Sequence, residues 1–122
     1  MTFGRDADLM KAVNLTTQQE LACNMVTAKN VFARMKGLLG KSSLQPGEAM
    51  LIEPCNGIHT FGMRFAIDII FLDRENRVVA ITKDMRPNRL TPLYFRAKRV
   101  IELPAGTVEK TATATGHEVG IV

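Results

Sequence analysis

The chain has 122 residues, of which 46% are hydrophobic and 23% are charged, and its formal net charge is +4. A chain of this length forms one domain with a core of its own, so its two cysteines are not needed as a disulfide staple. No stretch approaches the roughly 18 uninterrupted apolar residues of a membrane helix, and no repeat or flexible linker divides the chain. We expect a single globular domain over residues 1–122 with no membrane span.

The first ten residues carry two acids and no apolar segment of the kind that a secretory signal needs. Cys23 and Cys55 are then expected to be free thiols in a cytoplasmic protein.

Short apolar stretches at residues 11–15 and 20–26 predict two strands, the second half-buried because its apolar side chains alternate. From residue 28 to 39 the apolar side chains recur at helical spacing, and Gly40 stands where a helix C-terminus favours a left-handed residue. One helix of real length is therefore expected here. A turn and a short strand over residues 49–52 follow.

Two β-branched runs, at residues 67–73 and 78–82, predict a hairpin whose turn contains Asn76, a residue that tolerates positive φ. An irregular connection, a strand over residues 99–103, a turn at 104–106 and an edge strand near residues 118–122 complete the pattern. The fold class is mainly β (α+β): a small partly closed β-barrel or folded sheet of about seven short strands with one covering α-helix.

The stretch from Glu53 to Asp73 is the most informative, because unusual polar groups precede and interrupt the most apolar run of the chain. Asp68 lies inside that run, where a carboxylate is costly to bury without a partner. A loop that leads into an apolar strand places its side chains near the mouth of a concavity. The candidate pocket residues are Cys55, His59, Phe61, Met63, Arg64 and Asp68.

Two roles are open for Asp68: a general acid or base among apolar neighbours, or a structural carboxylate hydrogen-bonded to backbone groups or to Arg64. In an extended strand these two residues share a face but lie about 13 Å apart, so direct pairing needs a bend. Arg64, beside two phenylalanines, is the better candidate for contacting an anion or a carboxylate.

Cys55 and His59 are spaced as C-x3-H, which suits an activated thiol or a pair of metal ligands. A zinc site needs three or four ligands, and the other histidine, His117, and Cys23 are distant in sequence. A histidine that lines a polar pocket is the simpler interpretation, and we expect no metal and no cofactor.

Positive charge is concentrated between Lys83 and Arg99, where six bases and one acid give +5, which leaves about −1 for the rest of the chain. Such a segment could neutralise phosphates of nucleic acid. Lys and Arg also commonly guard exposed loops and sheet edges, and two adjacent aromatic residues, Tyr94 and Phe95, do not make a nucleic-acid module. Nucleic acid is therefore a lower alternative.

Several motifs together resemble a bacterial and archaeal family, domain of unknown function number 192. They are Ala33-Arg-Met-Lys-Gly-Leu-Leu-Gly40, His59-Thr-Phe-Gly-Met-Arg-Phe-Ala-Ile-Asp-Ile-Ile-Phe-Leu-Asp73 and Val100-Ile-Glu-Leu-Pro-Ala-Gly106, over roughly residues 28–122. The resemblance implies a compact, mainly β fold with a short helix and no agreed activity. It also implies that the family's recurring positions here are Arg34, Gly37, Met63, Asp68, Glu102 and Gly106.

Arg34 could reach Asp68 or Glu102 as a buried ion pair, and Gly37 indicates close packing of the helix on the sheet, since glycine inside a helix costs up to about 1 kcal/mol. We expect Arg34, Gly37, Glu102 and Gly106 to have structural roles.

The leading hypothesis is a small binding or accessory module with a pocket near residues 54–68, which takes a small anionic or carboxylate-bearing ligand or a protein partner. The main alternative is a small hydrolase-like enzyme that uses Asp68 with His59 or Cys55. Binding ranks first because the chain has no phosphate-binding glycine loop, nucleophile elbow or complete triad, and no catalytic residue is assigned.

Overall fold

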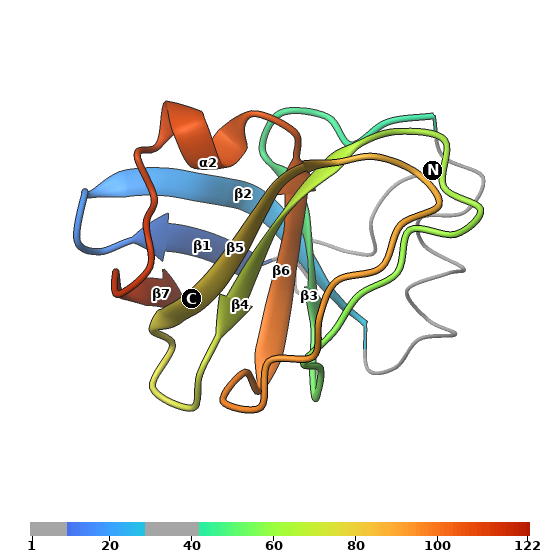
Figure 1. The fold of residues 1–122 in the computed structure, drawn as a ribbon. Helices are drawn as coiled ribbons and strands as arrows, with labels where there is room; N and C mark the ends of the chain where they lie inside the picture. Colours follow the sequence, from blue (N-terminus) through green and yellow to red (C-terminus); the bar gives the residue numbers. More distant parts are fainter. Residues whose placement is uncertain (1–9, 29–41) are drawn as a thin grey trace.

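The computed structural model describes residues 10–28 and 42–122, which form one strongly curled sheet (Figure 1). Its seven strands follow the order β5-β4-β6-β3-β2-β1-β7. In chain order they are β1 (Met10–Asn14), β2 (Gln19–Ala28), β3 (Glu48–Ile52), β4 (Ile67–Leu72), β5 (Val78–Met85), β6 (Arg99–Pro104) and β7 (Val119–Ile121). The mainly β class is confirmed.

The predicted helix over residues 28–39 lies outside the described residues, except for Ala28. That residue ends β2, where it pairs in parallel with Ile52 of β3. The other strand pairs of the sheet are antiparallel. A four-residue helix, α2 (Thr107–Lys110), was not predicted; it follows β6 directly and lies over one end of the sheet (Figure 1).

The two ends of the sheet meet along part of their length, as expected for a partly closed barrel. Val78, at the start of β5, donates its N–H to the carbonyl of His117 at 2.9 Å and accepts a hydrogen bond from the N–H of Gly116 at 2.8 Å. Asn14, fully buried at the end of β1, supports the same closure. Its side-chain amide donates to Thr113 Oγ1 at 2.9 Å and to His117 Nδ1 at 3.1 Å.

All six side chains of β4 are buried, so both faces of this strand are covered. Because successive side chains of a strand point to opposite faces, Ile67, Ile69 and Phe71 pack in one cluster, whereas Ile70 and Leu72 pack in the other. The continuous apolar run in the sequence is the pattern typical of a strand covered on both faces.

The hairpin predicted between β4 and β5 is confirmed. Asn76 adopts φ 61° in its turn, and Asp73 Oδ1 accepts the N–H groups of Glu75 and Arg77, each at 2.9 Å. Strand β5 continues beyond the predicted end at residue 82 to Met85, because a bulge preserves its pairing with the start of β4.

Candidate functional site

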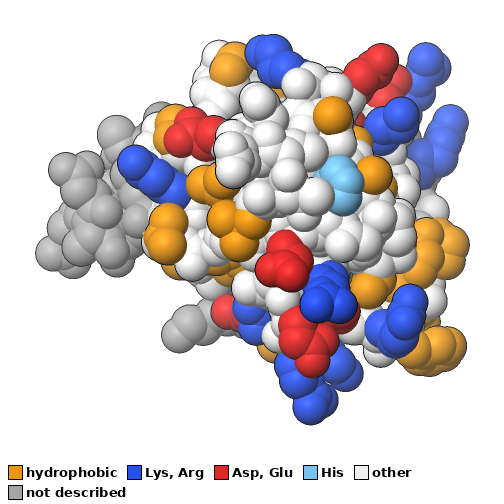
Figure 2. Space-filling view, turned by 90° about the vertical axis from the view of Figure 1, so that its left-hand side faces the viewer, with side chains coloured by type: hydrophobic (Ala, Val, Ile, Leu, Met, Phe, Trp, Pro, Cys, Tyr) orange, Lys and Arg blue, Asp and Glu red, His pale blue; other side chains and the backbone are white. Residues whose placement is uncertain are grey.

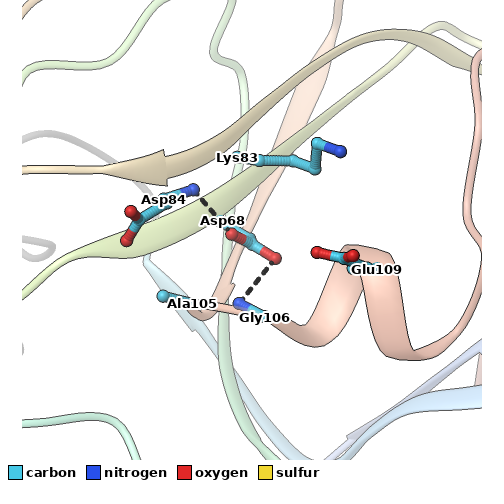
Figure 3. A pocket seen from close by; sticks show the side chains of 6 residues that line it. All are labelled: Asp68, Lys83, Asp84, Ala105, Gly106 and Glu109. Carbon is cyan, nitrogen blue, oxygen red and sulfur yellow. Dashed lines mark hydrogen bonds between the residues drawn. The ribbon is translucent and has the colours of Figure 1, made fainter.

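Asp68 is almost completely buried in the second position of β4, and both of its carboxylate oxygens accept hydrogen bonds from backbone N–H groups. Oδ1 accepts from Asp84 at 2.8 Å. Oδ2 accepts from Gly106 at 3.1 Å (Figure 3). It also accepts from Val108 at 2.8 Å. Asp68 therefore joins three segments that are distant in sequence: β4, the end of β5 and the start of α2.

These hydrogen bonds satisfy donors that the fold would otherwise leave without partners. Asp84 has φ 49° and lies in the bulge of β5, where the regular register with β4 is interrupted. Gly106 is the N-cap residue of α2 and has φ 97°. As a glycine it has no side chain that could cap the helix. The first N–H groups of a helix need an external acceptor, and the Asp68 carboxylate provides it.

A hollow of about 460 Å³ opens beside this carboxylate. Figure 3 shows the Glu109 carboxylate of α2 pointing toward Asp68, with the Lys83 side chain above them. The lining residues are Asp68, Lys83, Asp84, Ala105, Gly106 and Glu109. No group of three or more His, Cys, Asp or Glu side chains that could hold a metal ion occurs among residues 10–28 and 42–122.

A second feature lies on the other face of β4. Segments 54–66 and 86–98, here called the loop pair, run side by side at the edge of the molecule, at the right in Figure 1. Backbone hydrogen bonds hold them together: the N–H of Thr91 donates to Ile58 at 2.9 Å, and the N–H of Tyr94 donates to Asn56 at 2.9 Å. His59 and Leu90 form an isolated antiparallel bridge between the segments.

Thr60 is the buried centre of the loop pair. Its hydroxyl donates to the carbonyl of Arg86 at 2.7 Å and accepts the N–H of Arg89 at 2.9 Å. Its backbone carbonyl also accepts the N–H of Asn88 at 3.0 Å. This one residue therefore fixes the path of the whole 86–89 turn.

The loop pair is anchored to the sheet by apolar contacts. Tyr94 packs against the buried ring of Phe71, with ring centroids 4.6 Å apart, and Ile58 and Met63 are buried in the same cluster. The inner side of the loop pair therefore packs against the sheet, and its outer side faces solvent.

That outer side is unusually apolar. Six large hydrophobic side chains are strongly exposed among the described residues, and four of them belong to the loop pair. Their exposed fractions are 47% for Phe61, 70% for Leu90, 64% for Leu93 and 84% for Phe95. Phe61 stacks on the ring of His59 at 5.4 Å, and His59 in turn bridges to Leu90. Partners across an antiparallel pair point to the same face, so these three side chains form one patch.

The loop pair is also strongly basic. It contains no aspartate or glutamate and five bases, all exposed: Arg64, Arg86, Arg89, Arg96 and Lys98. Figure 2, which views the molecule from the left-hand side of Figure 1, shows a different kind of face, with acidic and basic side chains beside one another. The concentration of one sign of charge therefore distinguishes the loop pair.

A hollow of about 380 Å³ lies where β5 meets the loop pair and is here called the basic hollow. Three of its lining residues, Lys83, Arg86 and Arg89, are basic, and one, Asp84, is acidic. Its apolar side includes Leu90, which also belongs to the patch with His59 and Phe61. Positive charge and exposed apolar surface therefore adjoin at one place.

The chain matches the family model of domain of unknown function 192, described as "Uncharacterized ACR", over residues 13–121. It belongs to this family. The match begins earlier than residue 28, where the resemblance was expected to start. A curated relative, the UPF0127 protein of Thermococcus sibiricus, is 30% identical over 114 residues, which cover 88% of this chain and 71% of the relative.

Two solved structures share the fold of this family member. A protein of unknown function from Novosphingobium aromaticivorans has a TM-score of 0.77 and 19% identity, covering 92% of this chain and 83% of its own. A protein from Sinorhizobium meliloti described as a candidate transcription regulator has a TM-score of 0.76 and 16% identity, covering 91% and 90%. No helix in residues 10–28 and 42–122 is long and apolar enough to cross a membrane.

The single pocket predicted near residues 54–68 is divided in this structure. Asp68 lies two residues before Ile70, so its side chain points to the same face of β4, toward the cluster that contains Val108. Met63 is buried in the cluster on the opposite face, together with Phe71. The physical reason is the two-residue period of the strand, which separates the carboxylate from the loop that precedes it.

The remaining predicted residues lie along the loop pair. Cys55 borders a hollow of about 250 Å³ with Lys98 and donates its thiol to the carbonyl of Gly57 at 3.2 Å. His59 and Phe61 are in the exposed patch, and Arg64 is exposed. Both cysteines are free thiols in the structure.

The expected structural positions fall into two groups. Glu102 is fully buried on β6, and Gly106 has the left-handed backbone that favours glycine. Arg34 and Gly37 lie outside the described residues. Thr60 was missed in the sequence, because a threonine in a loop gives no local sign that its hydroxyl will bond to residues 26 and 29 positions away.

Proposed function

We propose that this protein is a binding module whose contact surface is the outer side of the loop pair, and that its partner carries negative charge together with apolar groups. The observation that carries the proposal is that one pair of segments combines five exposed bases, no acid and four of the six large apolar side chains that are strongly exposed among the described residues. Exposed apolar surface rimmed by charge is typical of interaction sites.

The rigidity of the loop pair supports a role in recognition. Hydrogen bonds at Thr60, Thr91 and Tyr94 tie the two segments together, and apolar contacts anchor them to β4. A surface that is already ordered loses little conformational freedom when a partner binds, so more of the contact free energy appears as affinity.

Binding is favoured over the hydrolase-like alternative because of what Asp68 contacts. Both oxygens of its carboxylate accept backbone N–H groups, and the side chain faces away from the loop pair that contains Cys55 and His59. A general base must reach the proton that it abstracts, and a catalytic pair must share one site.

The charge component is tested on a polyanionic heparin column with two variants of equal charge. Arg86→Ser/Arg89→Ser removes two bases of the loop pair, whereas Arg74→Ser/Arg77→Ser removes two exposed bases near the β4–β5 turn. If the loop pair binds the polyanion, the first variant elutes at clearly lower salt than the second, because fewer counterions are exchanged at the contact.

Circular dichroism of both variants checks that each remains folded. Equal shifts of the two elution positions would mean that only net charge matters, and would contradict a localised surface.

A further inference from the structure

We infer that the partner is a protein segment in which carboxylates alternate with large apolar side chains. In this arrangement an acidic side chain of the partner enters the basic hollow, and an apolar side chain packs on the patch of His59, Phe61 and Leu90. This inference rests on the proposed function and names its partner class. The juxtaposition that carries it is the position of Leu90, which lines the hollow and also bridges to His59.

The type of base favours a protein carboxylate. Four of the five bases in the loop pair are arginines, and two of these, Arg86 and Arg89, line the basic hollow. A guanidinium binds a carboxylate or a phosphate through two parallel hydrogen bonds, which a lysine cannot do, so the arginines indicate an anion with paired oxygens. Arginine and aromatic residues are enriched at protein interfaces, whereas lysine is depleted.

The type of apolar residue disfavours nucleic acid. Single-stranded nucleic acid is held by aromatic rings on which bases stack, and its interfaces are otherwise polar. Here two of the four exposed apolar side chains are leucines, Leu90 and Leu93, which offer no stacking face. Tyr94 is not available for stacking either, because its ring packs against Phe71.

The concave shape disfavours a lipid surface as the main partner. A hollow of about 380 Å³ can accept a group that projects from a chain, and three bases are among the residues that line it. A bilayer instead presents many headgroups in one plane, to which exposed bases are attracted wherever they lie on the facing surface.

The experiment measures binding of four fluorescent probes near physiological salt: a short peptide of Glu, Leu and Phe, a peptide of the same length and charge with Ser replacing Leu and Phe, oligouridylate, and phosphatidylcholine vesicles containing phosphatidylglycerol. The Glu/Leu/Phe peptide is expected to bind at least about tenfold more tightly than the Glu/Ser peptide. It is also expected to bind more tightly than the other two probes.

Matched variants locate the contact. Leu90→Ser and Arg89→Ser should each weaken the Glu/Leu/Phe peptide by about tenfold or more, whereas Leu15→Ser, which removes an exposed leucine outside the loop pair, should change its affinity by less than about twofold. Thermal melts confirm that each variant is folded.

Equal binding of the two peptides, tighter binding of oligouridylate or vesicles, or equal effects of Leu90→Ser and Leu15→Ser would overturn the inference. If no peptide binds while the heparin difference between the arginine variants persists, the partner class is wrong and the proposed surface stands. Loss of that heparin difference would instead remove the proposed function itself.

Discussion

Replacing Asp68 by asparagine tests whether this carboxylate is a structural acceptor. The wild-type side chain accepts three backbone N–H groups, one on Oδ1 and two on Oδ2. An amide has a single acceptor oxygen, so in either orientation its NH₂ group faces at least one N–H donor. The best orientation keeps the two hydrogen bonds of Oδ2 and loses the one from Asp84.

The expected loss follows from these contacts. A hydrogen bond to a charged group contributes about 1.5–3 kcal/mol, and a buried donor left without an acceptor costs about 1–3 kcal/mol. Both estimates include the loss of the same hydrogen bond, so they are not simply added. We therefore expect Asp68→Asn to lower the free energy of unfolding by about 2–4 kcal/mol. For a domain of this size that corresponds to a fall in melting temperature of roughly 8–16 °C.

Urea denaturation followed by far-ultraviolet circular dichroism measures the change, because the chain has no tryptophan. Asp84→Asn is the matched control: it removes the same charge nearby, but Asp84 bonds to Asp68 only through its backbone, and its side chain is exposed. The control should stay within about 0.5 kcal/mol of the wild type. An Asp68→Asn protein as stable as this control would refute the structural role.

Three further substitutions test other parts of the structure by the same denaturation experiment. Thr60→Val should lower the free energy of unfolding by about 1–3 kcal/mol, because the carbonyl of Arg86 and the N–H of Arg89 lose the hydroxyl that they share. Thr60→Ser keeps this hydroxyl and should cost less, so equal losses would contradict this account. Asn14→Ala should cost about 2–4 kcal/mol, since its buried amide makes hydrogen bonds through both ends, and a loss under about 1 kcal/mol would be inconsistent with that network. Gly106→Ala should cost about 1–2 kcal/mol from the left-handed backbone alone, because an added methyl group would meet nothing within 4 Å. Gly106→Asn should cost less, since asparagine tolerates this backbone, and a larger loss for Asn than for Ala would be evidence against backbone strain.

The parts of the fold that depend on short-range pattern were predictable. The run from Ile67 to Leu72 indicates a buried strand by its composition, and the turn that contains Asn76 indicates the hairpin with β5. No local sequence pattern predicts the parallel pairing of β2 with β3 or the bulge at Asp84, because both depend on how distant segments meet.

The candidate site was predictable only in part. The sequence identified Asp68 as a carboxylate that needs a partner, but its partners lie 16, 38 and 40 residues away. The basic charge of the 83–99 segment was visible in the sequence, and the loop pair was not, because its two halves meet through hydrogen bonds between residues about thirty positions apart.

Residue-resolved NMR gives the most direct test of the proposed surface. Backbone amide shifts of the ¹⁵N-labelled protein are followed while the Glu/Leu/Phe peptide is added. The proposal predicts that the largest changes lie in residues 56–64 and 83–96, which include the patch and the basic hollow. Changes centred on Gly106 to Glu109, beside Asp68, would contradict it and would move the site to the other face of β4.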